Sequence, residues 1–370
     1  MARTGTRMAE HTDDSYYTGI PSRRDQGERK PLPLVDPDAM KDPSGYLAPP
    51  GLVAAVNVAL ELGMPLLLTG EPGCGKSRLA DSLAWELGFG DGKPLRFVVK
   101  SDTESRDLFY RFDTVGRFHA AQHEADRPDA RRFVTYNALG KAILYAKGRR
   151  RIRAQGLAIM TEDQLAQIPL EGQRTVVLID EIDKAPREIP NDILTEIEDL
   201  SFTVPELLHE TPICLEDHEQ GNRPVVVITS NSERELPEPF LRRCIYYHVE
   251  LPPFRQDLKG DERNDGEVVT IERIVEGRLG VRFSANSPVL TDALALFRYL
   301  RMPERNLQRR PGLAELLNWL TFLASRRGED GIRLAEHRDF RASVGTTLLK
   351  HRDDQLRAGD FIKAWQDATP

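Results

Sequence analysis

The chain has 370 residues, of which 40% are hydrophobic and 29% charged, and its formal net charge is −7. This profile is typical of a globular protein of two or three domains, and it argues mildly against a protein that coats nucleic acid without sequence preference. There is no run of 18 apolar residues and no secretory signal, so we expect a cytoplasmic protein without a membrane span. Three scattered cysteines and eight histidines without metal-ligand spacing argue against a disulfide framework or a zinc site.

The first part of the chain predicts an arm followed by alternating helices and strands. Residues 1–45 are polar and rich in Pro, Gly, Arg and Asp, which indicates a flexible arm. A helix is predicted from Pro50 to Gly63, and the apolar strand PLLLTG follows it. Further strands are predicted at 95–99, 175–179, 225–229 and 245–251, and helices at 77–87, 137–147 and 189–200. Strands that alternate with helices predict a doubly wound parallel α/β sheet.

Two other stretches complete the predicted organisation. Residues 101–174 exceed what one strand–helix unit needs, so we predict an insertion there, with a hairpin as one way to fold it. After Pro253 the pattern is helical, at 288–300, 312–325 and 342–350. Leu313, Leu316, Leu317 and Leu320 have the spacing of an amphipathic helix. The prediction is therefore an arm (1–45), an α/β domain (46–255) and a smaller all-α lid domain (256–370).

A glycine-rich loop stands between a predicted strand and a predicted helix. The string GEPGCGKS fits the pattern G-x-x-x-x-G-K-[ST] in full. Its glycines permit close approach of the backbone, and the loop N–H groups and the start of the helix attract phosphate. Lys76 would reach the β- and γ-phosphates, and the Ser77 hydroxyl suits magnesium. We predict a nucleotide site formed by Gly70, Glu71, Pro72, Gly73, Cys74, Gly75, Lys76 and Ser77.

A second strand, in TVVLIDEIDKA, ends in two acids. In a parallel sheet, ligands bind beyond the carboxyl ends of the strands, where Asp180 and Glu181 would lie. Asp180 would hold magnesium through its water shell, and Glu181 would orient or deprotonate the water that attacks the γ-phosphate. The alternative is a solvated acidic turn, which the nearby phosphate loop disfavours.

Three more polar residues follow the next strand, VVVIT. Asn231 would hydrogen-bond the γ-phosphate or the attacking water, with an ordinary turn-forming Asn as the alternative. Arg242 and Arg243 end the next short helix, where they cannot easily reach the nucleotide of their own chain. They would reach that of a neighbouring subunit, unless they are only a solvated helix end.

Taken together, these strings resemble the AAA+ superfamily of P-loop ATPases and, within it, the MoxR-like ATPases of the dynein-related AAA group. The resemblance covers about residues 50–325 and rests on GEPGCGKS, VVLIDEIDKAPREIPNDILTEIED, ITSNSERELPEPFLRRC and the helices that follow. It implies that Gly70–Ser77 form the Walker A loop and that Asp180 and Glu181 form Walker B. It also implies Asn231 as sensor 1 and Arg243 as the arginine finger, with Arg242 beside it.

The resemblance further implies ATP and Mg²⁺ as ligands and a hexameric ring. It implies a protein partner that the ATPase remodels or activates, often one with a von Willebrand factor A domain. The chain departs from the family at sensor 2, where it reads LQRRPGLAELLNWL. Arg310, with Arg309 as second choice, is our prediction for that residue, because Pro311 would begin the helix beside them.

Two other functions stay open on the sequence. One is a nucleotide-gated scaffold or switch with slow hydrolysis. The other is a DNA-linked motor, and the choice between ATP and GTP stays open with it. The basic run KGRRRIR at 147–153 is more typical of a solvated face than of a nucleic-acid patch, so nucleic acid is not indicated.

Overall fold

The computed structural model describes residues 42–368 apart from 124–127, 187–192, 194–196, 232–235, 261–267, 285 and 327–330. All but residues 42–45 of the predicted arm, and most of the predicted helix 189–200, therefore lie outside the described residues. Residues 43–370 form one compact unit, which contains the fold described below. The predicted boundary between α/β domain and lid falls inside this unit and stays a prediction.

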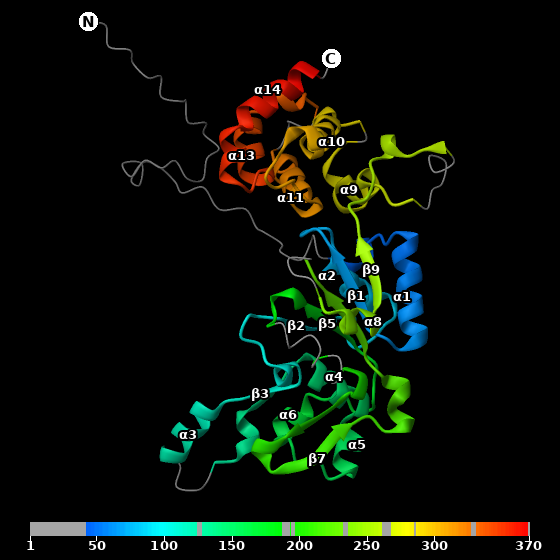
Figure 1. Ribbon diagram of the computed structural model, residues 1–370, viewed down its shortest axis with the longest axis vertical. Helices are drawn as coiled ribbons and strands as arrows, with labels where there is room; N and C mark the ends of the chain where they lie inside the picture. The colour runs from blue at the N-terminus through cyan, green and yellow to red at the C-terminus, as the bar shows by residue number, and fades with distance from the viewer. Residues whose placement is uncertain are drawn as a thin grey trace, which may run out of the picture. The chain divides into compact units, whose positions relative to one another are not determined.

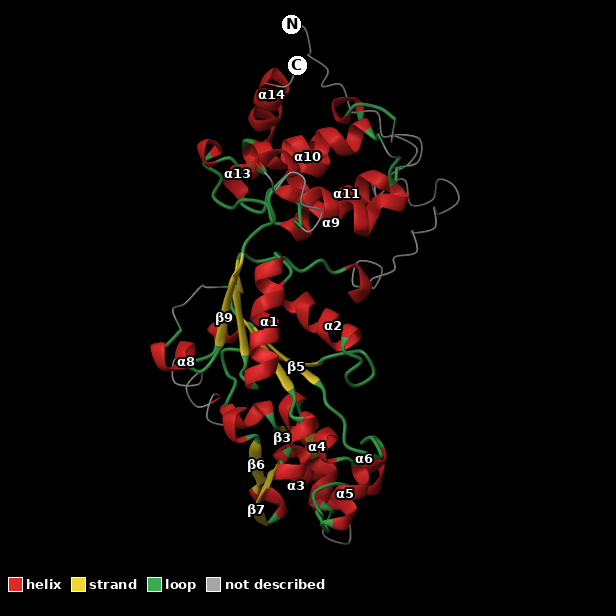
Figure 2. Cartoon of the chain, turned by 90° about the vertical axis from the view of Figure 1, so that its right-hand side faces the viewer, coloured by secondary structure: helices red, strands yellow, loops and turns green. Residues whose placement is uncertain are grey.

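Five parallel strands form the central sheet, in the order β2-β5-β8-β1-β9 (Figure 1). Their bounds are β1 Leu66–Gly70, β2 Leu95–Val98, β5 Val176–Asp180, β8 Val225–Thr229 and β9 Ile245–Val249. Every pair among them is parallel, so their carboxyl ends share one edge. The predicted doubly wound parallel sheet is confirmed, and its strands appear in yellow in Figure 2.

Helices cover both faces of this sheet. Leu67 of β1 belongs to a core that includes α4 (Ala138–Lys147), whereas Leu66 and Leu68 belong to another with α1 (Pro50–Leu62) and α2 (Lys76–Glu86). Successive side chains of a strand point to opposite faces, so a strand that is apolar throughout needs cover on both sides. The continuous apolar runs in the sequence have this cause.

The first helix has the ends that its sequence predicts. Pro50 stands at its first position, where the fixed φ of proline suits a helix and no N–H is needed. Gly63 ends it with φ 63°, and the Gly63 N–H donates to the Ala59 carbonyl. This left-handed conformation is one that a side chain disfavours, and glycine is the usual residue there.

The predicted insertion consists of two pieces on either side of α4. Before α4, strands β3 (Tyr110–Phe112) and β4 (Val134–Tyr136) pair antiparallel. Helix α3 (Thr114–His123) lies between these strands in the sequence, so they do not form a tight hairpin. After α4 come α5 (Arg149–Ala154) and α6 (Glu162–Ala166). Helix α4 itself covers the sheet and belongs to the α/β core rather than to the insertion.

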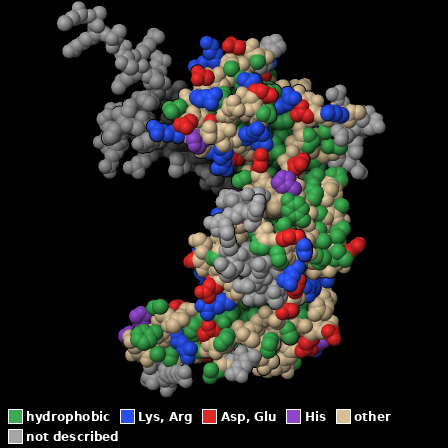
Figure 3. Space-filling view, viewed as in Figure 1, with side chains coloured by type: hydrophobic (Ala, Val, Ile, Leu, Met, Phe, Trp, Pro, Cys, Tyr) green, Lys and Arg blue, Asp and Glu red, His purple; other side chains and the backbone are tan. Residues whose placement is uncertain are grey.

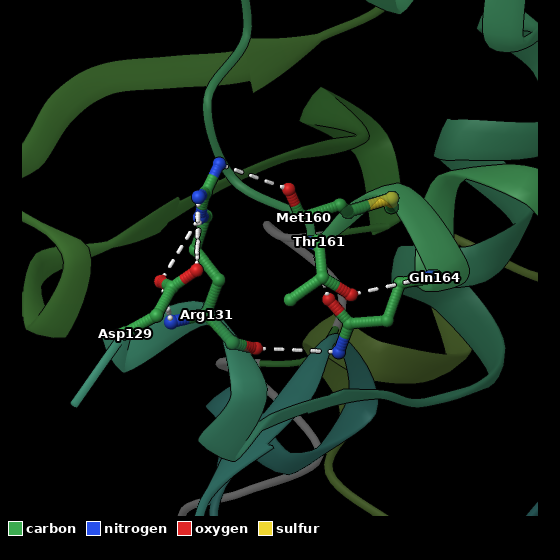
Figure 4. Close-up of polar contacts among 5 residues, drawn as sticks. All are labelled: Asp129, Arg131, Met160, Thr161 and Gln164. Atoms are coloured by element: carbon green, nitrogen blue, oxygen red, sulfur yellow. Dashed lines mark hydrogen bonds and ion pairs between the residues drawn. The ribbon is translucent and has the colours of Figure 1, made fainter. Parts of the chain in front are cut away.

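Polar contacts fasten the β4 side of this insertion to α6 (Figure 4). The Arg131 guanidinium donates to the Asp129 carboxylate at 2.8 Å and to the Met160 carbonyl at 3.3 Å. Gln164 donates to the Arg131 carbonyl, and the Thr161 hydroxyl caps α6 by accepting from the Gln164 N–H. The bond from Arg131 also holds the pKa of the Asp129 carboxyl below its usual range.

A second antiparallel pair, which the sequence analysis did not predict, packs against the first. It consists of β6 (Ser201–Val204) and β7 (His209–Cys214). The Phe202 ring stacks on Phe109 at 5.3 Å between centroids and lies edge-on to Tyr136. These aromatic contacts join the insertion to the segment that precedes β8.

Three arginines of the basic run at 147–153 are paired with acids. Ion pairs join Arg150 to Glu171, Arg151 to Glu219 and Arg153 to Glu162. In Figure 3 basic and acidic side chains are interspersed over the visible face. This pairing favours the solvated-face interpretation over a patch that binds nucleic acid.

The helical domain follows β9 and begins with α9 (Ile271–Leu279), α10 (Pro288–Arg301) and α11 (Leu313–Ala324). Leu316 and Leu320 of α11 are fully buried, and Leu317 is half-buried, as the predicted spacing requires. Trp319 is also buried, and its indole N–H donates to the Ser343 hydroxyl at 3.0 Å. Two short helices, α12 (Phe340–Ser343) and α13 (Arg352–Leu356), and the longer α14 (Ala358–Ala368) complete the domain.

The predicted helix 342–350 is not regular. Helix α12 ends at Ser343, and a π-helical turn runs over Val344–Leu348. Gly345 and two threonines lower helix propensity there. The Thr346 hydroxyl bonds back to the Ala342 carbonyl, a contact that bends helices.

Lys147 and Glu219 form a buried ion pair. Lys147 at the end of α4 donates to Glu219 at 2.8 Å, and both side chains are at most 4% exposed. A charge removed from water is tolerated only with a close partner, so each of these residues depends on the other.

We expect Glu219→Ala to lower the free energy of unfolding by about 3–5 kcal/mol, because Lys147 then stays buried and unpaired. Urea denaturation followed by circular dichroism measures this change. The control Glu162→Ala breaks an exposed pair and should cost less than about 1 kcal/mol. Equal losses in the two variants would contradict the prediction.

Candidate functional site

The phosphate loop occupies the turn between β1 and α2, at the carboxyl edge of the sheet. Gly70 has φ +142°, and a Cβ there would lie 2.3 Å from the Val249 carbonyl oxygen of β9. Gly75, with φ +98°, precedes the first residue of α2. The glycines are therefore required by the backbone path, and they leave the first N–H groups of α2 facing the loop.

Lys76 is buried inside this loop, with 5% of its surface exposed. Its ammonium donates to the Gly70 carbonyl at 2.8 Å and the Glu71 carbonyl at 3.0 Å. None of the contacts recorded for Lys76 among the described residues is with a carboxylate. A buried cation without an anionic partner is costly, so the loop fits an anion such as a phosphate group.

Ser77, Asp180 and Thr229 meet beside Lys76. The Ser77 hydroxyl donates to Asp180 Oδ1 at 2.8 Å, and the Thr229 hydroxyl donates to the same oxygen. Helix α2 and strands β5 and β8 thus bring these three side chains together, and the Ser77 hydroxyl and the Asp180 carboxylate form the pair that could hold a metal ion. Magnesium in nucleotide sites is held by one or two such groups together with substrate phosphates and water, so this pair fits the ion. The described residues hold no group of three or more His, Cys, Asp and Glu side chains that could bind a metal without a nucleotide.

Glu181 has a left-handed backbone, with φ 61° and ψ 49°. Its N–H donates to the Thr229 hydroxyl at 3.0 Å, which fixes the turn against β8. Its carboxylate accepts from Lys184 at 2.6 Å. Such strained conformations are concentrated at functional sites, where surrounding contacts maintain them.

Asn231 follows β8, which is the neighbour in the sheet of the strand that Glu181 follows, β5. Its backbone N–H donates to Asp183 Oδ1 at 3.2 Å, so the ends of β5 and β8 are joined a second time. Asp183 is 4% exposed, and its other carboxylate oxygen has no hydrogen-bond partner among the described residues. The structure thus places Asn231 at the same edge as Lys76, Ser77, Asp180 and Glu181.

Arg242 and Arg243 lie near the amino ends of the parallel strands, whereas the phosphate loop lies at their carboxyl ends. Arg243 stands two residues before β9, whose first residue, Ile245, pairs with Leu66 at the start of β1. The phosphate loop begins at Gly70, about 13 Å farther along the strand at 3.3 Å per residue. Arg242 pairs with Glu238, and Arg243 pairs with Glu198 at 3.4 Å. The structure does not bring either arginine to the loop of its own chain.

Arg309 and Arg310 lie beside the phosphate loop, across a cavity of about 330 Å³ that Glu71 and Pro72 also line. Arg310 is exposed, and Arg309 lies 3.8 Å from Glu315. The expectation that Pro311 begins the helix was wrong, because α11 begins at Leu313 with Gly312 as its cap. The arginines therefore stand in the connection before α11 and not in its first turn.

Tyr46 lies against the phosphate loop, and Cys74 is a buried member of the loop itself. The Tyr46 ring is 3.7 Å from the place a Gly75 Cβ would occupy, and burial raises the pKa of its hydroxyl. Cys74 is buried, and this burial raises the pKa of its thiol despite the nearby Lys76 ammonium. The structure gives Cys74 the character of a small packing residue rather than of a reactive thiol.

Three residues of this region were not identified from the sequence. Thr229 orients the two acids, Lys184 neutralises Glu181, and Arg301 contacts Glu71 at 3.0 Å. Thr229 had a signal, because it is a polar residue that ends a buried strand. Arg301 had none, because it is one of many arginines in a polar stretch.

A family model of the AAA domain (dynein-related subfamily) matches residues 65–244. No curated protein matches the sequence. Among solved structures, CDC6P from Pyrobaculum aerophilum is 16% identical, covers 87% of this chain and 74% of its own, and has a TM-score of 0.41. Domain III of the replication initiation protein DnaA from Thermotoga maritima is 13% identical, covers 86% and 100%, and scores 0.38. No helix within the described ranges is long and apolar enough to cross a membrane.

We expect iodoacetamide at neutral pH to alkylate Cys214 and to spare Cys74 and Cys244. Cys214 is exposed, whereas burial raises the pKa of Cys74 and raises that of Cys244 to about 12, so both stay as unreactive thiols. Peptide mass spectrometry locates the label, and unfolding in urea should open all three sites. Rapid labelling of Cys74 in the folded protein would be inconsistent with this loop geometry.

Proposed function

We propose that this chain, whose residues 65–244 form an AAA domain of the dynein-related subfamily, couples Mg²⁺-dependent ATP hydrolysis in an oligomer to remodelling of a protein partner. The AAA domain makes the chain an ATPase with nucleotide-dependent activity. The observation that carries the proposal is the buried ammonium of Lys76 at the start of α2. Among the described residues, its hydrogen bonds go to atoms of the loop itself. A triphosphate supplies the negative charge that this arrangement lacks.

The proposed roles follow from position and chemistry. The loop N–H groups and Lys76 bind the phosphates, and Ser77 and Asp180 hold magnesium. When bound, the ion neutralises charge on the phosphates. Glu181 accepts the proton of the attacking water, and Asn231 orients the same water by a hydrogen bond.

The oligomer and the trans-acting arginine belong to the proposal as well. Arg243 lies near the amino ends of the strands, remote from the phosphate loop of its own chain, and 44% of its side chain is exposed. A guanidinium there is accessible to an adjacent subunit, and its fork geometry suits a phosphate. We propose that it completes the site of the neighbouring chain in a ring, with a hexamer as the expected form.

Resemblance to MoxR-like ATPases supports a protein partner, with a von Willebrand factor A domain as the expected kind. Nucleic acid has less support, because arginines of the basic run are paired with Glu171, Glu219 and Glu162.

A second candidate is a nucleotide-gated switch with slow hydrolysis. The contact between Lys184 and Glu181 at 2.6 Å favours it, because the Glu181 carboxylate is held by Lys184 and would have to turn from it to orient a water. Negligible turnover in an assembled oligomer that still needs ATP to form would support this candidate.

We expect Glu181→Gln to bind Mg-ATP and to lose turnover by roughly 10²- to 10⁴-fold, since it cannot accept the proton. Lys76→Ala should abolish nucleotide binding. Isothermal titration with a non-hydrolysable analogue and a phosphate-release assay measure both effects, with the exposed surface change Glu162→Gln as the control. Unchanged turnover in Glu181→Gln, or unchanged binding in Lys76→Ala, would disprove the proposed site. Proteins retained by Glu181→Gln with ATP would identify the partner.

The arginine in trans predicts complementation. Arg243→Ala and Glu181→Gln should each be inactive alone, whereas an equal mixture should recover roughly a quarter of the wild-type turnover, because that share of interfaces pairs intact Glu181 with intact Arg243. Phosphate release after subunit exchange provides the measurement. The control is Arg153→Ala, which removes an exposed arginine remote from the strand ends and should stay active. A mixture as inactive as its parts would refute action in trans.

A further inference from the structure

The phosphate loop and the helical domain touch directly. The Ala314 N–H in the first turn of α11 donates to the Gly73 carbonyl at 3.3 Å. A Cβ on Gly73 would lie 3.1 Å from the Ala314 Cβ, and one on Gly312 would lie 3.0 Å from the Pro72 carbonyl oxygen. A side chain on either glycine would therefore press against the other segment. Any displacement of the loop must therefore move α11 or break this contact.

One side chain reinforces the same junction. Arg301, the last residue of α10, donates to Glu71 Oε2 at 3.0 Å and to the Pro311 carbonyl at 2.7 Å. Only 14% of its side chain is exposed. A single guanidinium thus joins the phosphate loop to the segment that leads into α11, and its planar fork fixes both acceptors at once.

Glu71 is also a residue that Lys76 holds. The Glu71 carbonyl accepts from the Lys76 ammonium at 3.0 Å, while the Glu71 carboxylate accepts from Arg301. If Lys76 turns to a phosphate, it releases this carbonyl. Nucleotide binding would therefore free the backbone carbonyl of Glu71, while the Glu71 carboxylate stays attached to the helical domain through Arg301.

We infer that Arg301 is a positioning residue that couples nucleotide occupancy of the phosphate loop to the helical domain. The inference rests on the proposed nucleotide site. Arg309 and Arg310 line the neighbouring cavity, but among the described residues the ion pair to the loop is made by Arg301.

The test uses the full chain, a non-hydrolysable ATP analogue with magnesium, and two measurements. Titration calorimetry gives the dissociation constant. Hydrogen exchange gives the protection that the nucleotide adds to the first turns of α11, which a merely structural role of Arg301 would leave intact. The variants are Arg301→Gln, Glu71→Gln and the double variant. Arg298→Gln is the matched control, because it removes an exposed pair with Asp257 one turn earlier on the same helix.

We expect Arg301→Gln to weaken binding about 5- to 100-fold and to abolish the added protection of α11. Glu71→Gln, which leaves an exposed position uncharged, should do the same. The double variant should be no weaker than either single one, because both remove one interaction. Arg298→Gln should resemble the wild type.

Three results would overturn the inference alone. The first is that Arg301→Gln weakens nucleotide binding no more than Arg298→Gln does, and the second is that the nucleotide still protects α11 in Arg301→Gln. The third is a strictly additive loss of affinity in the double variant. If the unaltered chain binds no analogue at all, the proposed function fails first and the coupling fails with it.

Discussion

The structure of this site depends on a buried ammonium. Lys76 lies at the start of α2, inside a turn that has three glycines with positive φ. Its ammonium donates to two carbonyl oxygens and to the Cys74 sulfur of that turn. Burial of a cation with neutral partners is tolerable when an anion completes its shell. The parallel sheet makes this arrangement possible, because it collects the loop, the Asp180 carboxylate and the strand end at Asn231 along one edge.

The acids at that edge are held more tightly than a strand end alone would hold them. Thr229 donates to Asp180 and accepts from the Glu181 N–H, so one hydroxyl fixes both residues. Asp183 accepts from the backbone of Asn231 and thereby connects the two strand ends again. The left-handed conformation of Glu181 persists because of these contacts.

Much of this architecture could be predicted from local patterns. The apolar strands, the helix between Pro50 and Gly63, and the strand–loop–helix order around GEPGCGKS each follow from side-chain periodicity and from the special backbone of Pro and Gly. The prediction failed where competing contacts decide. At the π-helical turn over 344–348 the Thr346 hydroxyl bonds back to the Ala342 carbonyl, and at the start of α11 the Gly312 N–H donates to the Glu315 carboxylate.

The sequence by itself determined which residues are the candidates for binding phosphate and magnesium, because the proposed roles require particular residue types in short, contiguous strings. Tertiary structure alone decided which side chains meet: that Ser77 reaches Asp180, that Lys184 pairs with Glu181, and that Arg301 contacts Glu71 from 230 residues away. Such contacts depend on strand order and helix packing, and no local pattern encodes them.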